Sequence, residues 1–296
     1  MNLPLTTTTA GQTSVQPRRA RGRRALGRVP IYVLLILGAV PMAFPFYYMV
    51  ASSLMTPDEL IQIPITWWPH HPQWQTYANV WTVIPFARMF GNSLFVTAAV
   101  TAGILLTSSL AGFGFAKYNF KGRDTVFLAV LSSMMVPFFV LLIPVYYIIK
   151  ELGWLDTYQG LIVPNIVTAF GIFLMRQFIR TIPDEFLEAA RIDGSGEFWI
   201  NWRIILPQVK PALSALGIFA FIYQWENFLW PLLILQSSSM YTVPIGLNSL
   251  RSYADSQQNA NLLMAGSVLA VVPSVVVFLL LQRQFVRGIA MGGIKG

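Results

Sequence analysis

The segment from Glu188 to Pro207, EAARIDGSGEFWINWRIILP, is polar and of mixed charge, and it lies between two long apolar runs. We expect it to form two short helices that meet at a glycine. Thr181 is placed to cap the first helix, Pro183 suits its first turn, and Gly194 ends it. A helix of about 11 residues would be roughly 16 Å long, which is too short to cross a bilayer. The segment therefore predicts a loop outside the membrane.

Both helices of this loop would carry apolar side chains. Ser195 is placed to cap the second helix, and Pro207 is placed to kink the chain as it enters the next apolar run. In the first helix one broad apolar side would be formed by Phe186, Leu187, Ala189, Ala190 and Ile192. The second helix would carry Phe198, Trp199, Ile200 and Trp202. Such a patch is costly in water, so the loop either docks on another protein or lies flat on the lipid headgroups. The residues themselves leave both alternatives open.

The spacing of Glu188-Ala189-Ala190, Gly194, Ile204 and Leu206-Pro207 resembles the EAA loop of permease subunits in binding-protein-dependent ABC importers. The resemblance implies that the loop forms a coupling helix. Such a helix sits in a cleft of the ATP-hydrolysing subunit and carries its opening and closing into the membrane. The residues expected to couple this chain to an ATPase are Glu188, Ala189, Ala190, Asp193, Gly194, Leu206 and Pro207.

The composition indicates a membrane protein. The chain has 296 residues, of which 55% are hydrophobic and only 11% are charged, too few to coat a soluble globule. A net charge of +8 could suggest nucleic acid, but the basic residues are sorted by membrane side and no nucleic-acid partner is expected. There is no cysteine, and the adjacent His70 and His71 cannot both face one ligand sphere from a helix face. We therefore expect no metal site.

The order of apolar runs predicts an all-α, polytopic membrane protein. Residues 1–29 are basic and rich in Thr, Gln and Pro, and they predict a disordered cytoplasmic tail. Residues 30–296 would form one transmembrane permease domain. Its six spans are expected at about 31–54, 94–116, 125–149, 161–179, 212–235 and 262–281, each long enough for about 30 Å of hydrocarbon.

Charge sets the orientation of these spans. With the amino terminus inside, all of the 20 Lys and Arg residues fall on the inner side except Arg88, Lys150 and Arg251. Positive charge accumulates on the cytoplasmic side of membrane proteins. Both termini and the 183–207 loop are therefore expected in the cytoplasm, where ATP is available.

The chain lacks the groups that an ATPase or a hydrolase needs. It contains no Gly-Lys pair, hence no phosphate-binding loop of the GxxxxGK[ST] type. Ser195 lies between two glycines, but it would be across the membrane from both histidines. We expect no catalytic residue and no cofactor on this chain, with ATP and Mg held by partner ATPase subunits.

One predicted span carries a polar cluster. Glu226 is the only carboxylate inside a span, and Gln224, Trp225 and Asn227 flank it. A charge there is costly, so Glu226 either faces a polar cavity on the translocation path or lies near enough to the outer interface to be hydrated. The cluster is similar to a Trp-Asn-Glu-Phe run of carbohydrate-uptake permeases, with the order of Glu and Asn exchanged.

The ending, GIAMGGIKG at Gly288 to Gly296, resembles the maltose-type second permease, whose tail reaches the ATPase subunits. Gly292, Gly293 and Lys295 would form this extended tail. The resemblance implies a sugar importer in a bacterial or archaeal cytoplasmic membrane. Its partners would be a second, unlike permease, two ATP-binding cassette subunits and an extracytoplasmic sugar-binding protein. Another solute, such as glycerol phosphate, and an ATP-independent secondary transporter or channel remain as alternatives.

Overall fold

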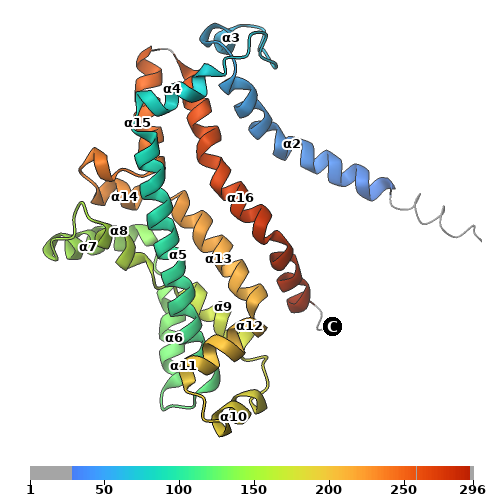
Figure 1. Ribbon diagram of the computed structural model, residues 1–296, viewed down its shortest axis with the longest axis vertical. Coiled ribbons are helices and arrows are strands. Elements are labelled where there is room, and N and C mark those ends of the chain that lie inside the picture. Colours follow the sequence, from blue (N-terminus) through green and yellow to red (C-terminus); the bar gives the residue numbers. More distant parts are fainter. Residues whose placement is uncertain (1–28, 258, 294–296) are drawn as a thin grey trace, which may run out of the picture. The chain divides into compact units, whose positions relative to one another are not determined.

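The computed structural model describes residues 29–257 and 259–293, and every regular element in this part of the chain is helical (Figure 1). The all-α prediction is confirmed. The chain divides into two compact units, Met1–Tyr48 and Met49–Gly296, which are treated separately below. The prediction of a disordered tail at 1–29 falls, except for its last residue, outside the described residues.

The first unit contains most of helix α2 (Val29–Ser53), which coincides with the span expected at 31–54. The helix continues through Pro41 and Pro45, and the ring of Phe44 stacks on that of Tyr48 with centroids 6.3 Å apart. None of its apolar window is buried within the chain. Among its described side chains only the last, those of Ala51 to Ser53, are buried, and the exposed apolar side chains before them are compatible with lipid as the surrounding solvent.

The second unit is built around α5 (Phe86–Lys117), a helix of 32 residues. Helices α9 (Ala169–Ile179) and α13 (Lys210–Trp225) pack against α5, and α16 (Ala260–Gly293) packs against α13 (Figure 1). The spans expected at 94–116 and 262–281 lie within α5 and α16, and both helices continue beyond them. Gly292 and Gly293 belong to the end of α16, so their backbone is helical and not extended as expected, while Lys295 lies outside the described residues.

Two of the expected spans contain a break. In 125–149, α6 (Arg123–Ser133) and α7 (Phe138–Glu151) meet at 98°. In 161–179, α8 (Tyr158–Ile162) and the 3₁₀ turn η1 (Val163–Asn165) meet α9 at 43°. Pro137 lies at the first break, directly before α7, and a proline disfavours the helical region for the residue that precedes it. Pro164 lies in η1, shortly before the second break, although Val163 before it keeps helical φ and ψ of −59° and −42°. Apolar length does not reveal these breaks.

The fifth expected span, 212–235, is also divided. Helix α13 ends at Trp225 and the short α14 (Leu229–Ile234) follows. Upstream, the segment Glu197–Gln208 meets α13 at 89°. Among the described residues, α2, α5 and α16 are each long and apolar enough to span a membrane, and up to six spans result if each bent pair counts as one. The number six stays a prediction.

Short elements gather at the end of the second unit that lies opposite the EAA-like loop (Figure 1). They are α3 (Pro57–Ile61), α4 (Gln75–Val83), the 3₁₀ turn η3 (Ser238–Met240) and α15 (Val243–Gln257). The start of α5 holds this end together. The Asn92 amide donates to the carbonyls of Ser239 and Tyr241 at 2.9 and 3.0 Å, and the Ser93 hydroxyl accepts from the Val243 N–H at 2.8 Å.

Close packing of α5 against α9 requires a residue without a side chain at Gly112. A Cβ atom placed there would lie 2.6 Å from the Cβ of Met175 and 2.9 Å from the backbone nitrogen of Arg176. Backbone atoms cannot move aside as a flexible side chain can. Gly112 therefore permits the close approach of the two helices at this point.

We expect Gly112→Ala to lower the stability of the protein by about 1–3 kcal/mol, because the added methyl group overpacks the contact between α5 and α9. The thermal midpoint of the purified chain in detergent measures this loss. Gly114→Ala is the matched control in the same helix, since nothing lies within 4 Å of a Cβ at Gly114. Equal midpoints for the two variants would contradict the role of Gly112.

Candidate functional site

The first helix of the EAA-like loop is α10 (Glu185–Ile192), which begins later than the sequence suggests. Thr181 does not cap it, because the Thr181 hydroxyl donates to the Phe178 carbonyl at 2.7 Å and so belongs to the end of α9. Asp184 occupies the N-cap position without a side-chain cap bond. Its carboxylate is engaged instead by the ammonium group of Lys117, with the two atoms 2.6 Å apart. A tertiary ion pair has replaced the local cap.

The end of α10 is where the sequence places it. Gly194 has φ of +80°, a backbone conformation that side chains with a Cβ rarely adopt. The N–H of Gly194 donates to the Arg191 carbonyl at 3.0 Å, and the N–H of Ser195 donates to the Ala190 carbonyl at 2.9 Å. This pair of bonds is a Schellman motif, which satisfies carbonyls left free at the helix end. Gly194 as the stop of the helix is confirmed.

The predicted single apolar side of α10 is wrong, because the structure divides its apolar residues between two faces. Leu187 and Ala190 are buried, with Leu187 only 2% exposed, and both join the main apolar core. Phe186, Ala189 and Ile192 point outward, with Ile192 86% exposed. We call this outward set the α10 outer face. One face fastens the helix and the other is available for a partner.

The second part of the loop consists of α11 (Glu197–Trp199), the π-helix η2 (Ile200–Ile205) and α12 (Leu206–Gln208). Gly196 precedes it, and α11 has no side-chain cap, so Ser195 does not cap it as predicted. Buried on its inner side are Ile200, Asn201, Ile205 and Leu206. Exposed on its outer side are Phe198, Trp199 and Trp202, here called the aromatic patch. The Phe198 and Trp202 rings lie parallel, with centroids 6.3 Å apart.

The expected coupling residues thus fall into two groups. Ala190 and Leu206 are buried and hold the loop against the rest of the unit. The others are exposed: Glu188, Ala189, Asp193, Gly194 and Pro207.

Charged groups join the loop to the end of α5 at Lys117. The Lys117 side chain is only 4% exposed, and its ammonium donates both to Asp184 and to the Ile182 carbonyl. Across the glycine turn, the Arg191 guanidinium donates to both carboxylate oxygens of Glu197, at 2.7 and 3.2 Å. These bonds hold the pKa of Glu197 below its usual value, so its carboxylate is charged at neutral pH. Bidentate pairs of this kind also fix orientation.

Arg176 is a further fastening residue that the sequence did not single out. Its side chain is buried in α9, where Nε donates to the Phe115 carbonyl at 3.2 Å and a terminal nitrogen lies 3.2 Å from Asp124 Oδ1. Its guanidinium carbon also lies 3.9 Å from the centre of the Phe127 ring. This one side chain joins α9 to the end of α5 and to the start of α6. The sequence feature that could have identified it is a single arginine within an apolar run, which is costly unless the charge is paired.

The four residues of the polar cluster, Gln224 to Asn227, do not face one common surface. Trp225 is buried, its indole N–H donates to the Ala270 carbonyl at 2.8 Å, and its ring stacks on Phe221. It packs α13 against α16 and offers no free ring face to a ligand. Gln224 is also buried, and the Asn227 side-chain oxygen accepts from the N–H of Trp230 at 3.4 Å.

Glu226 is the one member of this cluster whose side chain is exposed. It follows the last residue of α13, with φ of −86° and ψ of −2°, and so lies at the break before α14.

Glu226 continues an exposed aromatic stripe on α13. Tyr223 precedes it by about one helical turn and Phe219 by about two, on the same face, and both are exposed. They help to line an apolar pocket of about 350 Å³ with Phe170, whose ring meets Phe219 edge to face at 6.5 Å. The spacing of four and three residues was visible in the sequence. The sequence does not show which face of α13 packs against the core, and so it does not show that this stripe is exposed.

Comparison with known proteins gives the class of this chain. Residues 99–291 match the family model of the binding-protein-dependent transport system inner membrane component. The chain belongs to this family, and it is a membrane-embedded permease of an ABC importer, not an enzyme. The EAA-like loop and the exposed end of α13 both lie within the matched residues.

Individual relatives agree with this class. The chain is 36% identical over 264 residues to the sn-glycerol-3-phosphate transport system permease protein UgpE of Yersinia enterocolitica, covering 87% of this chain and 94% of the relative. It is 38% identical over 258 residues to the arabinooligosaccharides transport system permease protein AraQ of Halalkalibacterium halodurans, covering 86% and 91%.

Its fold resembles a chain of a bacterial ABC transporter involved in the import of the acidic polysaccharide alginate. The TM-score is 0.78 and the sequence identity 23%, over 91% of this chain and 100% of that one.

We expect Gly194→Ala to loosen α10, because a left-handed residue with a Cβ costs about 1–2 kcal/mol. Hydrogen exchange of the amides in residues 185–195 should become faster in this variant. Gly196→Ala is the control, since Gly196 has φ of −71° and nothing lies within 4 Å of its Cβ position. The same acceleration in both variants would show that the backbone of Gly194 has no special role.

Proposed function

We propose that this permease carries neutral sugars or oligosaccharides inward and that α10 is its coupling helix. It would work with a second, unlike permease, two ATP-binding cassette subunits that hold ATP and Mg, and an extracytoplasmic sugar-binding protein. It would lie in a bacterial or archaeal cytoplasmic membrane with both termini inside. The carrying observation is the α10 outer face: three apolar side chains directed outward from a short helix that is fastened on its other face.

The fastening supports transmission of force. Movement of α10 is passed to α5 through Lys117 and Asp184, and to α11 through Arg191 and Glu197. The segment that begins with α11 continues into α13 through the bend at Val209. Because α13 carries the exposed stripe that ends at Glu226, a displacement of α10 also displaces a wall of the proposed path.

The two parts of the loop would contact different surroundings. Segment Glu197–Gln208 meets α13 at 89°, so it lies in the membrane plane when α13 is upright. Its outer side carries the aromatic patch together with the exposed Arg203. Tryptophan and arginine are suited to the headgroup layer. We assign the aromatic patch to lipid and the α10 outer face to the ATPase subunit.

Cysteine crosslinking in the assembled complex tests this assignment. We expect Ala189→Cys and Ile192→Cys to form adducts with the ATPase subunit whose yield changes when nucleotide is added. Ala190→Cys should form none, because Ala190 is buried on the opposite face. Trp202→Cys should form none either, since its neighbours would be lipid.

Absence of adducts at Ala189 and Ile192 in a complex that still transports would refute the coupling role of α10. An adduct at Trp202 would refute the placement of the aromatic patch against lipid. Transport by the purified chain without any ATPase subunit would favour the secondary-transporter alternative.

The nature of the cargo is less constrained than the coupling. The relatives transport arabino-oligosaccharides and sn-glycerol 3-phosphate, a neutral and an anionic solute. The stripe of Phe219, Tyr223 and Glu226 contains two aromatic rings and a carboxylate but no cation. Aromatic faces and carboxylate oxygens suit the CH faces and hydroxyls of a sugar, whereas a carboxylate repels phosphate. This chemistry favours a neutral sugar.

We expect Glu226→Ala to change sugar uptake by roughly tenfold or more, because a hydrogen bond to a charged group contributes about 1.5–3 kcal/mol. Uptake of several labelled sugars by the reconstituted complex measures the change in rate and in preference. Basal ATPase activity and assembly should persist. Glu151→Ala, at the exposed end of α7, is the control. Loss of assembly without a change in preference would make Glu226 a structural residue.

A further inference from the structure

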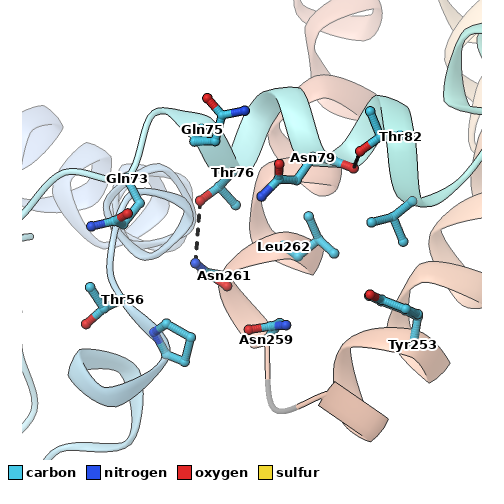
Figure 2. Close-up of a pocket in the computed structure, with 12 residues that line it drawn as sticks. Thr56, Gln73, Gln75, Thr76, Asn79, Thr82, Tyr253, Asn259, Asn261 and Leu262 are labelled. Atoms are coloured by element: carbon cyan, nitrogen blue, oxygen red, sulfur yellow. Dashed lines mark hydrogen bonds between the residues drawn. The ribbon is translucent and has the colours of Figure 1, made fainter.

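A polar pocket of about 420 Å³ lies at the end of the second unit opposite the EAA-like loop (Figure 2). Two segments distant in sequence form it, residues 56–83 before α5 and residues 253–262 around the start of α16. The lining residues are Thr56, Pro57, Gln73, Gln75, Thr76, Asn79, Thr82, Val83, Tyr253, Asn259, Asn261 and Leu262. Neither the proposed path nor the coupling loop includes any of them.

The chemistry of this outer pocket is polar and uncharged. Its twelve lining residues include five side-chain amides, three threonine hydroxyls and the Tyr253 phenol, and none of the twelve is an acid or a base. An amide offers both a donor and an acceptor, as a hydroxyl does. Such a lining matches a ligand that itself carries many hydroxyls and no charge. The volume falls within the usual range of about 300–1,000 Å³ for small-molecule sites.

The pocket has a rigid frame. The buried Asn261 donates from Nδ2 to the Met55 carbonyl at 3.0 Å and to the Thr76 hydroxyl at 3.5 Å, which ties α16 to the residue before the first segment and to the start of α4. Thr56 and Glu59 form a reciprocal cap at the start of α3. Asn79 is exposed, and Figure 2 shows its side chain and those of Asn259 and Tyr253 around Leu262. Fixed walls with exposed amides are what a binding site requires.

Three charged residues close to the lining in sequence, Glu59, Arg251 and Asp255, are engaged with other groups. The Glu59 carboxylate accepts from the backbone N–H groups of Thr56 and His70, at 2.9 and 3.0 Å. Arg251 lies 3.9 Å from Asp255, one turn away on α15. The lining contains no Arg or Lys. Proteins bind phosphate through these side chains or through clustered N–H groups. The pocket therefore discriminates against an anionic solute.

We propose that this outer pocket binds one neutral glycosyl unit before the sugar enters the membrane. Its place on a transport route rests on the proposed function, whereas the binding itself does not. Amides and hydroxyls would bond the sugar hydroxyls, and the Tyr253 ring would cover one pyranose or furanose face.

Saturation-transfer NMR on the full-length chain in lipid nanodiscs, without ATP, tests the binding. The probes are arabinotriose, maltotriose and sn-glycerol 3-phosphate. We expect at least one trisaccharide to bind saturably and the phosphate to give no signal. Asn79→Leu and Gln75→Leu, both at exposed positions, should each weaken trisaccharide binding by about tenfold, the effect of one or two lost hydrogen bonds. Asn248→Leu, exposed on α15 outside the lining, should leave it unchanged.

Failure of both trisaccharides to bind would overturn the proposal, as would binding that is the same in all three variants. Saturable binding of the phosphate in place of the sugars would overturn it as well. Uptake by the complete ATPase-containing complex separates this inference from the proposed function. ATP-driven sugar uptake that is unaffected by Asn79→Leu would overturn the place of the pocket on the transport route. It would leave the proposed function of the permease unchanged. Sugar binding at the pocket without ATP-driven uptake by the complex would support the binding site and reject the proposed function.

Discussion

The buried ammonium group of Lys117 is the constraint on which the end of the protein that carries the EAA-like loop depends. A charge removed from water must be paired and hydrogen-bonded, and here the partners are Asp184 and the Ile182 carbonyl. Both partners lie in the short connection between α9 and α10. The end of α5 and the start of α10 therefore cannot separate without leaving a charge uncompensated, and this determines where the EAA-like loop sits.

Once α10 is fastened in this way, its two faces have different roles. Leu187 and Ala190 complete the core, so the remaining apolar residues, including Ile192, are directed outward. The Schellman turn at Gly194 and the Arg191–Glu197 pair then align α11 with α10. A rigid corner with an apolar outer face can transmit the movement of a partner, whereas a flexible loop of the same composition could not.

At the end opposite the EAA-like loop, the contacts between segments are made by neutral polar groups. Asn92 and Ser93 bind the backbone of the segment before α15, and Asn261 binds the segment before α4. These amide and hydroxyl groups join the segments by hydrogen bonds and carry no net charge. Ion pairs of the described residues are concentrated instead at the opposite end, around Lys117, Arg176 and Arg191.

The sequence by itself determined the class of this protein, its helical content and the end of its first loop helix at Gly194. These depend on composition, on the spacing of the EAA-like residues and on glycine's conformational freedom, all of which are local. The tertiary structure alone decided that Thr181 caps nothing, that Ala190 and Trp225 are buried, and that Glu226 follows the end of α13 on the same face as Tyr223. The reason is that a cap, a face or a break is settled by partners far along the chain. Asp184 is drawn to Lys117, and the Trp225 indole to the Ala270 carbonyl, only when the helices have packed.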